Sequence, residues 1–152
     1  MIKVTKVKGG FDDLMAKLVS KSHSDTANVG WFASDGKHPT ADMTYPELAR
    51  YHATGSEGVP IRDVLNVAKV WFGGKKHERI DRAFTKYLLS GKDSDFEALV
   101  DAVGKSFWIE AINTIGSSSR LATTNNPTPL VDSGALKSNL KYNTSKKPNP
   151  RR

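Results

Sequence analysis

Four histidines are the side chains best suited to acid–base or metal chemistry, and they lie far apart in the chain. No two of them stand four residues apart, which is the spacing that brings two imidazoles to one helix face as zinc ligands. We therefore interpret them as solvated or capping side chains rather than as a metal site. They are His23, His38, His52 and His77.

Two pairs of neighbouring carboxylates have the side chains needed for a general acid and a general base. Asp12 and Asp13 form one pair, and Asp93 and Asp95 form the other. Both pairs come at the start of a predicted helix, where negative charge interacts favourably with the helix dipole. A structural role is the simpler interpretation of both pairs.

Two short motifs resemble catalytic motifs only superficially. Gly73-Gly74-Lys75-Lys76 lacks the leading glycine and the hydroxyl residue of a phosphate-binding loop, so we interpret it as a turn. Ser133-Gly134 lacks the flanking glycine of a nucleophile elbow, and we expect Ser133 to cap a short helical turn. The sequence therefore predicts a protein that is not an enzyme and takes no cofactor.

The composition indicates one globular domain. A chain of 152 residues can form one hydrophobic core, and 38% hydrophobic with 26% charged residues is typical of a folded protein. The chain has no cysteine, which excludes disulfides and thiolate metal sites. No apolar stretch is long enough to cross a bilayer, and the N-terminus lacks the apolar run of an export signal. We expect neither a membrane span nor export.

The net charge of +7 is concentrated at the C-terminal end. Subtracting the five cations of residues 141–152 from +7 leaves +2 for residues 1–140. We predict one folded domain over residues 1–144 and a disordered basic tail over residues 145–152. The tail cations could touch a DNA backbone without sequence preference, although an aromatic platform for stacking bases is missing. The five cations are Lys141, Lys146, Lys147, Arg151 and Arg152.

Apolar periodicity predicts the elements of the first half of the chain. Residues 10–21 have the stripe of an amphipathic helix, and residues 27–33 are typical of a strand. A capping box from Thr44 to Glu47 predicts a short helix that ends near Ala53, before Gly55. The predicted buried face of that helix consists of Leu48, Tyr51 and His52.

Residues 64–72 form an apolar run whose periodicity leaves helix and strand open. Residues 75–90 are typical of a helix that Gly91 closes. Its predicted apolar face consists of Ile80, Phe84, Tyr87 and Leu88.

A second capping box, from Ser94 to Glu97, predicts the start of a long helix that continues to Gly116. Residues 117–128 are rich in Ser, Thr and Asn and are typical of an exposed loop. The alternation of residues 139–144 predicts a final strand.

Two stretches, taken in order, resemble the pattern of phage virion morphogenesis proteins. In that family a strand with the pattern "vGf" precedes a short helix "la.ihEfG" and a segment "iP.RpFl". A closing pattern "pL.dTG.L..sI.y" follows after an intervening helical region. The chain departs from the pattern at Ala53-Thr54, where the family has an acidic-aromatic pair, and at Asp63-Val64, where it has Pro-Phe. The matching segments are Val29-Gly30-Trp31-Phe32, residues 44–52, Gly55, residues 59–65, residues 129–136 and Lys141-Tyr142.

The resemblance implies an α+β fold in which an antiparallel β-sheet packs against two or three helices, with long flexible loops and a disordered C-terminal tail. It also implies a structural role at the neck or upper tail of a bacteriophage virion, after assembly in the host cytoplasm. Such proteins act as copies in a homo-oligomeric ring. We therefore predict a tail-completion protein or head-tail connector. Its partners would be portal-side neck proteins on one side and tail tube or tail terminator proteins on the other.

A ring subunit needs surfaces and loops that become ordered against a neighbour. We expect Ser34 to Asp42, Gly55 to Pro60, Gly116 to Thr128 and the basic tail to serve in this way. Trp31, Trp71 and Trp108 could anchor an interface, but the alternative, packing in the core, is the commoner fate of tryptophan. The candidate interface residues are Trp31, Tyr51, His52, Gly55, Pro60, Arg62, Trp71, Leu130, Asp132, Leu136, Lys146 and Lys147.

Two other classes of function stay open. The first is a small basic protein whose tail contacts DNA. A DNA affinity that falls steeply with salt and is lost on removal of residues 145–152 would favour it. The second is an enzyme that uses His38 or His52, which requires both side chains in one pocket.

Overall fold

The computed structural model describes residues 16, 25–55, 58–121, 130 and 134–146. They form a mixed α+β arrangement with an antiparallel sheet, which confirms the predicted fold class. No helix among the described residues is long and apolar enough to span a membrane. The elements are β1 (Asp25–Gly30), the 3-10 turn η1 (Ala33–Asp35), α2 (Tyr45–Thr54), α3 (Val64–Gly73), α4 (Glu78–Ser90), α5 (Asp93–Thr114), α6 (Ala135–Ser138) and β2 (Lys141–Lys146).

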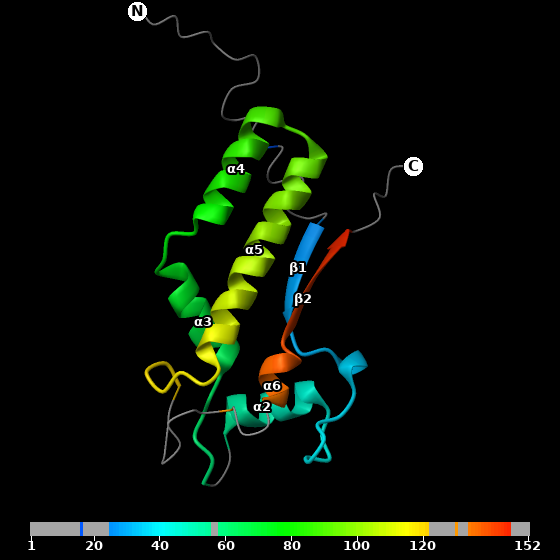
Figure 1. The fold of residues 1–152 in the computed structure, drawn as a ribbon, viewed down its shortest axis with the longest axis vertical. Helices are drawn as coiled ribbons and strands as arrows, with labels where there is room; N and C mark the ends of the chain where they lie inside the picture. The colour runs from blue at the N-terminus through cyan, green and yellow to red at the C-terminus, as the bar shows by residue number, and fades with distance from the viewer. Residues whose placement is uncertain (1–15, 17–24, 56–57, 122–129, 131–133, 147–152) are drawn as a thin grey trace, which may run out of the picture.

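The long helix α5 occupies the centre of the molecule, as Figure 1 shows. Helices α3 and α4 follow each other along one side of α5, and the β1–β2 ribbon lies against another side. The short helices α2 and α6 lie together at the end of the molecule where α5 finishes (Figure 1). The sheet therefore packs mainly on one helix, with α3 and α4 beyond it.

Close packing of α5 against the ribbon depends on a small residue. A Cβ atom at Gly104 would lie 2.8 Å from the Cβ atom of Ala27 in β1. That distance is shorter than any ordinary contact, so only glycine lets β1 approach α5 this closely.

The two strands pair from Asp25 with Lys146 to Gly30 with Lys141. Strand β1 starts two residues before the first predicted strand, and β2 ends two residues after the last one. Ser145 and Lys146 therefore belong to the fold and not to the predicted tail. The physical reason is the partner strand, because Thr26 bonds to Ser145 through their hydroxyls at 2.6 Å. Pairing between distant segments sets this boundary, and local composition does not report it.

The core lies between α3, the last turns of α5 and the start of β2. Trp31 and Trp108 pack against it, so core packing, the alternative raised for the tryptophans, applies to these two. Their indole N–H groups donate 2.7 Å hydrogen bonds to the backbone carbonyls of Leu136 and Leu140, respectively. These bonds fix α6 and the entry to β2. The buried core residues are Val64, Ala68, Ala111, Ile115, Leu121 and Leu140.

The capping box of α2 is confirmed. The N–H and the hydroxyl of Thr44 donate to the Glu47 carboxylate at 2.8 and 2.7 Å, and these bonds lower the pKa of Glu47. The predicted buried face is partly wrong, because Tyr45 is the buried residue and the Tyr51 side chain is exposed. Most of α2 packs at the edge of the molecule, so its large side chains are not enclosed on all sides.

The ambiguous run over residues 64–72 is helix α3. Asp63 caps it, because its Oδ1 atom accepts a hydrogen bond of 3.1 Å from the Asn66 N–H. Helix α4 has the predicted end at Gly91, which adopts a left-handed φ of 61°. Its predicted apolar face is partly wrong, since Tyr87 is buried while Phe84 and Leu88 are exposed. Among the described helices, α5 alone packs extensively on α4, so that face is only partly covered by them.

The second capping box is wrong. Helix α5 begins at Asp93, which places Ser94 and Glu97 inside the helix. Its end is as predicted, because Ile115 is the C-cap and Gly116 follows with a positive φ of 86°. A corner contact takes the place of the box, because Asp95 accepts a 2.6 Å hydrogen bond from Ser90 and lies 2.8 Å from the Lys86 ammonium. The tight turn after α4 thus sets the start of α5.

The expected flexible segment from Ser34 to Asp42 has defined contacts. Lys37 and Asp42 form an ion pair of 2.6 Å, and the backbones of Lys37 and Thr44 form an isolated antiparallel β-bridge. His38 accepts backbone hydrogen bonds of 3.2 Å from Thr40 and Ala41 through Nδ1, which is a capping role. Helix α6 starts after Gly134, with a φ of 68°, so Ser133 is not its N-cap.

Several predictions fall outside the described residues. They are the helix over residues 10–21 apart from Ala16, the aspartates Asp12 and Asp13, His23, the loop after Leu121, Asp132, Ser133 and the tail after Lys146.

Candidate functional site

A groove of about 380 Å³ lies where the end of β1, α2, the start of α3 and α6 meet. Most of the side chains in its wall are apolar, and we call it the apolar groove. Its lining residues are Val29, Gly30, Trp31, Phe32, Pro46, Ala49, Arg50, His52, Ala53, Arg62, Asp63, Val64, Leu65, Leu130 and Leu136.

The wall of the groove formed by α2 is a single helical stripe. Pro46, Ala49, Arg50 and Ala53 stand at positions i, i+3, i+4 and i+7, and all four line the groove. This stripe was not predicted from the sequence, because the larger apolar residues of the helix indicated a different face. Small side chains at residues 49 and 53 are what leave the space open, and their spacing was the available signal.

The connection from α2 to α3 holds the opposite wall in place. Gly55 ends α2 with a left-handed φ of 72°, and a Cβ atom there would lie 2.9 Å from Cγ1 of Ile61. The Arg62 N–H then donates a 2.7 Å hydrogen bond to the His52 carbonyl. Glycine is therefore required at residue 55 to bring the start of α3 beside the end of α2.

The structure brings together several predicted interface residues from distant parts of the sequence. Those that line the apolar groove are Trp31, His52, Arg62, Leu130 and Leu136. Both stretches that carry the family resemblance thus line the same groove, although they are far apart in the sequence.

The remaining candidates lie elsewhere. Gly55 and Pro60 belong to the α2–α3 connection, and the side chain of Tyr51 is 38% exposed on α2. Trp71 is on α3 and does not line the groove. Lys146 is the last residue of β2, whereas Asp132 and Lys147 are outside the described residues.

The groove has the side chains for binding rather than for an evident reaction. His52 lines it and His38 does not, so the two histidines do not share this pocket as the enzyme hypothesis requires. Both oxygens of Asp63 accept hydrogen bonds from Asn66, at 3.1 and 2.6 Å. Within the described part of the chain, no group of three potential metal ligands occurs. An apolar wall with Arg50 and Arg62 suits the capture of an apolar side chain from another protein.

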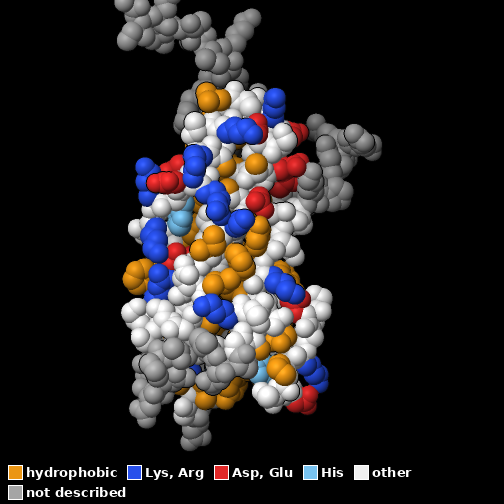
Figure 2. Space-filling view, viewed as in Figure 1, with side chains coloured by type: hydrophobic (Ala, Val, Ile, Leu, Met, Phe, Trp, Pro, Cys, Tyr) orange, Lys and Arg blue, Asp and Glu red, His pale blue; other side chains and the backbone are white. Residues whose placement is uncertain are grey.

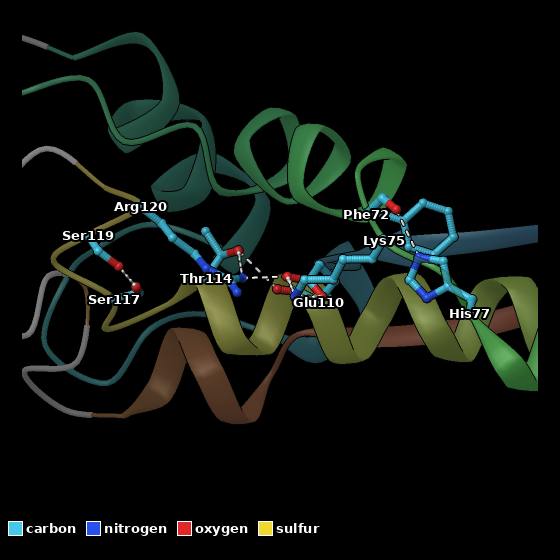
Figure 3. A network of polar contacts seen from close by, with 8 residues as sticks. All are labelled: Phe72, Lys75, His77, Glu110, Thr114, Ser117, Ser119 and Arg120. Atoms are coloured by element: carbon cyan, nitrogen blue, oxygen red, sulfur yellow. Dashed lines mark hydrogen bonds and ion pairs between the residues drawn. The ribbon is translucent and has the colours of Figure 1, made fainter.

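A second polar cluster is centred on Glu110 in α5, as Figure 3 shows. Its buried carboxylate accepts hydrogen bonds of 3.0 Å from Lys75 at both oxygens and pairs with Arg120. The Arg120 guanidinium also lies 4.5 Å from the ring centre of Trp71, whose side chain is 42% exposed. The cluster ties the α3–α4 turn and the segment after α5 to the central helix.

Burial alone would raise the pKa of Glu110, but the hydrogen bonds and charges of Lys75 and Arg120 outweigh it and hold the pKa below its ordinary value of 4.5. The carboxylate is therefore an anchored anion at neutral pH and not a proton donor. Sequence reasoning missed it, although a lone glutamate within the apolar stripe of a long helix was the available signal.

We expect Glu110→Gln to lower the free energy of unfolding at pH 7 by about 2 kcal/mol, because it leaves two cations without their carboxylate. The cost lies below that of a fully buried pair, since Lys75 is partly exposed. Because folding lowers this pKa, the stabilisation is complete above 4.5 and disappears as the pH falls through the folded-state value. Denaturant titrations should show the two proteins converging in acid, whereas Glu78→Gln, at an exposed first-turn position of α4, should cost less than about 1 kcal/mol. A constant difference between Glu110→Gln and wild type down to low pH would contradict the ion-pair assignment.

Comparison with known proteins adds no assignment, and the resemblance to phage virion morphogenesis proteins stays a prediction. No family model, curated protein or solved structure matches the chain.

Proposed function

We propose that this chain is a structural virion protein of a tailed bacteriophage, a tail-completion or head-to-tail joining protein that acts as a ring subunit. The observation that supports the proposal is the apolar groove. Residues from both stretches of the family pattern line it, although they come from separate parts of the sequence. In this proposal the function is carried by interfaces and needs no catalytic residue.

The groove has the properties of an anchor site at a protein interface. Such sites are concave, apolar and centrally placed, with a few polar groups that orient the partner. The Trp31 indole is fixed by the hydrogen bond that it donates to the Leu136 carbonyl, and Leu65 and Leu130 pack on the core. A wall held in this way is pre-organised, so little conformational entropy is lost when a partner side chain enters.

A ring with heterologous contacts needs a second, different patch on each subunit. The outer surface of α4 provides a candidate, since Phe84 and Leu88 are exposed there one helical turn apart. The groove lies at the end near α2 and α6, away from α4 (Figure 1). Two distinct apolar surfaces on one subunit are what a closed ring of identical copies requires.

Mass spectrometry of purified, DNA-filled phage particles tests this proposal. We expect the chain to be present in mature particles at a fixed ratio to the connector proteins, as a ring subunit must be. If the protein is abundant in infected cells but absent from washed particles, the structural role is wrong.

A further inference from the structure

Helix α4 carries three cations along one face. Arg79, Arg82 and Lys86 stand at positions i, i+3 and i+7, and Lys75 and Lys76 precede them in the α3–α4 turn. We call these five residues the basic row. Figure 2 shows Lys and Arg side chains gathered over α4 and the α3–α4 turn, with a few acidic groups among them.

The two ends of the basic row are neutralised by buried carboxylates. Lys75 binds both oxygens of Glu110 at 3.0 Å, and Lys86 lies 2.8 Å from Oδ1 of Asp95. These two lysines therefore stabilise the fold, and their charge is largely offset.

The middle of the basic row is different. Lys76, Arg79 and Arg82 form no ion pair with any carboxylate among the described residues. Arg82 donates from Nε to the carbonyl of Glu78 at 3.3 Å, which leaves its two terminal amino groups available. A turn and an adjoining helix face that together hold three charges without a carboxylate partner among the described residues are suited to an external anion.

These cations surround a hollow of about 270 Å³ between the start of α4 and α5. Of the two acidic residues in its wall, Glu110 is already bound by Lys75 and Arg120, so Glu78 is the only one not offset in that way. Positive charge therefore exceeds negative charge around the hollow. Its lining residues are Lys75, Lys76, His77, Glu78, Arg79, Arg82, Ser106, Ile109 and Glu110.

We propose that the basic row is a binding site for the sugar-phosphate backbone of double-stranded DNA. Guanidinium groups bind phosphate oxygens in a bidentate geometry, and phosphate contacts give affinity without sequence specificity. A duplex suits the site better than a single strand, because no Phe, Tyr or Trp is among the described residues that line the hollow, where bases would have to stack. The ring of His77, which lines the hollow, stacks on Phe72 with centroids 4.2 Å apart. This site lies on the folded domain, and its existence does not depend on the proposed virion role.

Fluorescence anisotropy with a short labelled duplex of arbitrary sequence, titrated over a range of salt concentrations, tests the proposal. Lys76→Ala/Arg79→Ala/Arg82→Ala removes the three unpaired cations. We expect its affinity to fall at least tenfold, and the slope of log affinity against log salt to decrease by about 2 to 3, one increment per lost phosphate contact. The matched control, Lys69→Ala/Lys92→Ala/Lys137→Ala, removes equal charge outside the basic row. It should retain most of the DNA affinity and most of the salt dependence.

Two further experiments test whether the C-terminal tail or a site for acidic proteins accounts for the binding. Thermal melts show whether every variant is folded. If Lys147→Ala/Arg151→Ala/Arg152→Ala abolishes binding while the basic-row variant retains it, the tail carries the contact and the proposal is wrong. Competition by poly-glutamate as effective as that of unlabelled duplex at equal charge would indicate a site for acidic proteins instead. Equal losses in the basic-row and control variants would show only general charge attraction, which also contradicts the proposal.

Discussion

Filling the apolar groove from its α2 wall is expected to abolish phage assembly while leaving the subunit folded. Ala53 lines the groove on the stripe of small residues of α2, so Ala53→Trp would place an indole in the space of about 380 Å³. Loss of an anchor contact costs about 2 to 4 kcal/mol at one interface, and a ring repeats that loss at every subunit. Complementation of a phage lacking this gene should therefore give a plaque titre at least a hundredfold below that of the wild-type gene.

Ala98→Trp is the matched control for this experiment. Residue 98 is exposed on α5 and does not line the groove, so an added indole there displaces nothing. We expect near wild-type titre from this variant and a cooperative thermal unfolding transition from both proteins. A folded Ala53→Trp protein that complements as well as Ala98→Trp would show that the groove receives no partner.

Truncation of Leu140 is expected to give the largest loss of stability among single core changes. The residue is 1% exposed and belongs to the core cluster between α3, α5 and β2. Leu140→Ala removes buried methyl groups and leaves a cavity, which costs about 3 to 4 kcal/mol. For a domain of this size, that change corresponds to a fall in Tm of about 10 °C.

Leu89 provides the matched comparison, because it is the same residue type on the surface. Its side chain is 85% exposed at the end of α4, so Leu89→Ala should change the free energy of unfolding by less than about 0.5 kcal/mol. Urea titrations of both variants measure the difference. Similar stability losses would mean that residues 140 and 89 are not packed as described.

Features set by neighbouring residues were predictable from the sequence. The capping box at Thr44 and Glu47 and the glycine after α4 depend on contacts within a few residues, and both are present. The apolar run of α3 stayed ambiguous because its periodicity does not separate a helix from a strand. The start of α5 was missed because the corner contact of Asp95 with Ser90 and Lys86 competes with a conventional cap.

Features that join distant residues were not predictable. β2 extends to Lys146 because β1 lies beside it, and the two segments are far apart in the chain. Glu110 and Lys75 are likewise separated by 35 residues. The groove could be predicted only in part, since Trp31 and Arg62 were candidate interface residues while Ala49 and Ala53 were not predicted to line a surface.

The basic row of the folded domain was likewise not predictable from the net charge. Residues 1–140 have a net charge of only +2, which suggested that the tail was the basic part of the protein. That sum hides the basic row, because acidic residues elsewhere in the chain cancel it in the count. In the structure two of those acids bind Lys75 and Lys86, and the cations between them keep their charge available.

Negative-stain electron microscopy of lysates tests the central claim, the role in joining or completing the virion, most directly. The lysates would come from a phage that encodes this chain, with the gene interrupted and the intact gene supplied in trans as the control. The proposal predicts DNA-filled heads separated from tails, with complete tails indicating a joining protein and tails of abnormal length indicating a completion protein. Normal, infectious particles in the absence of the protein would contradict the structural role.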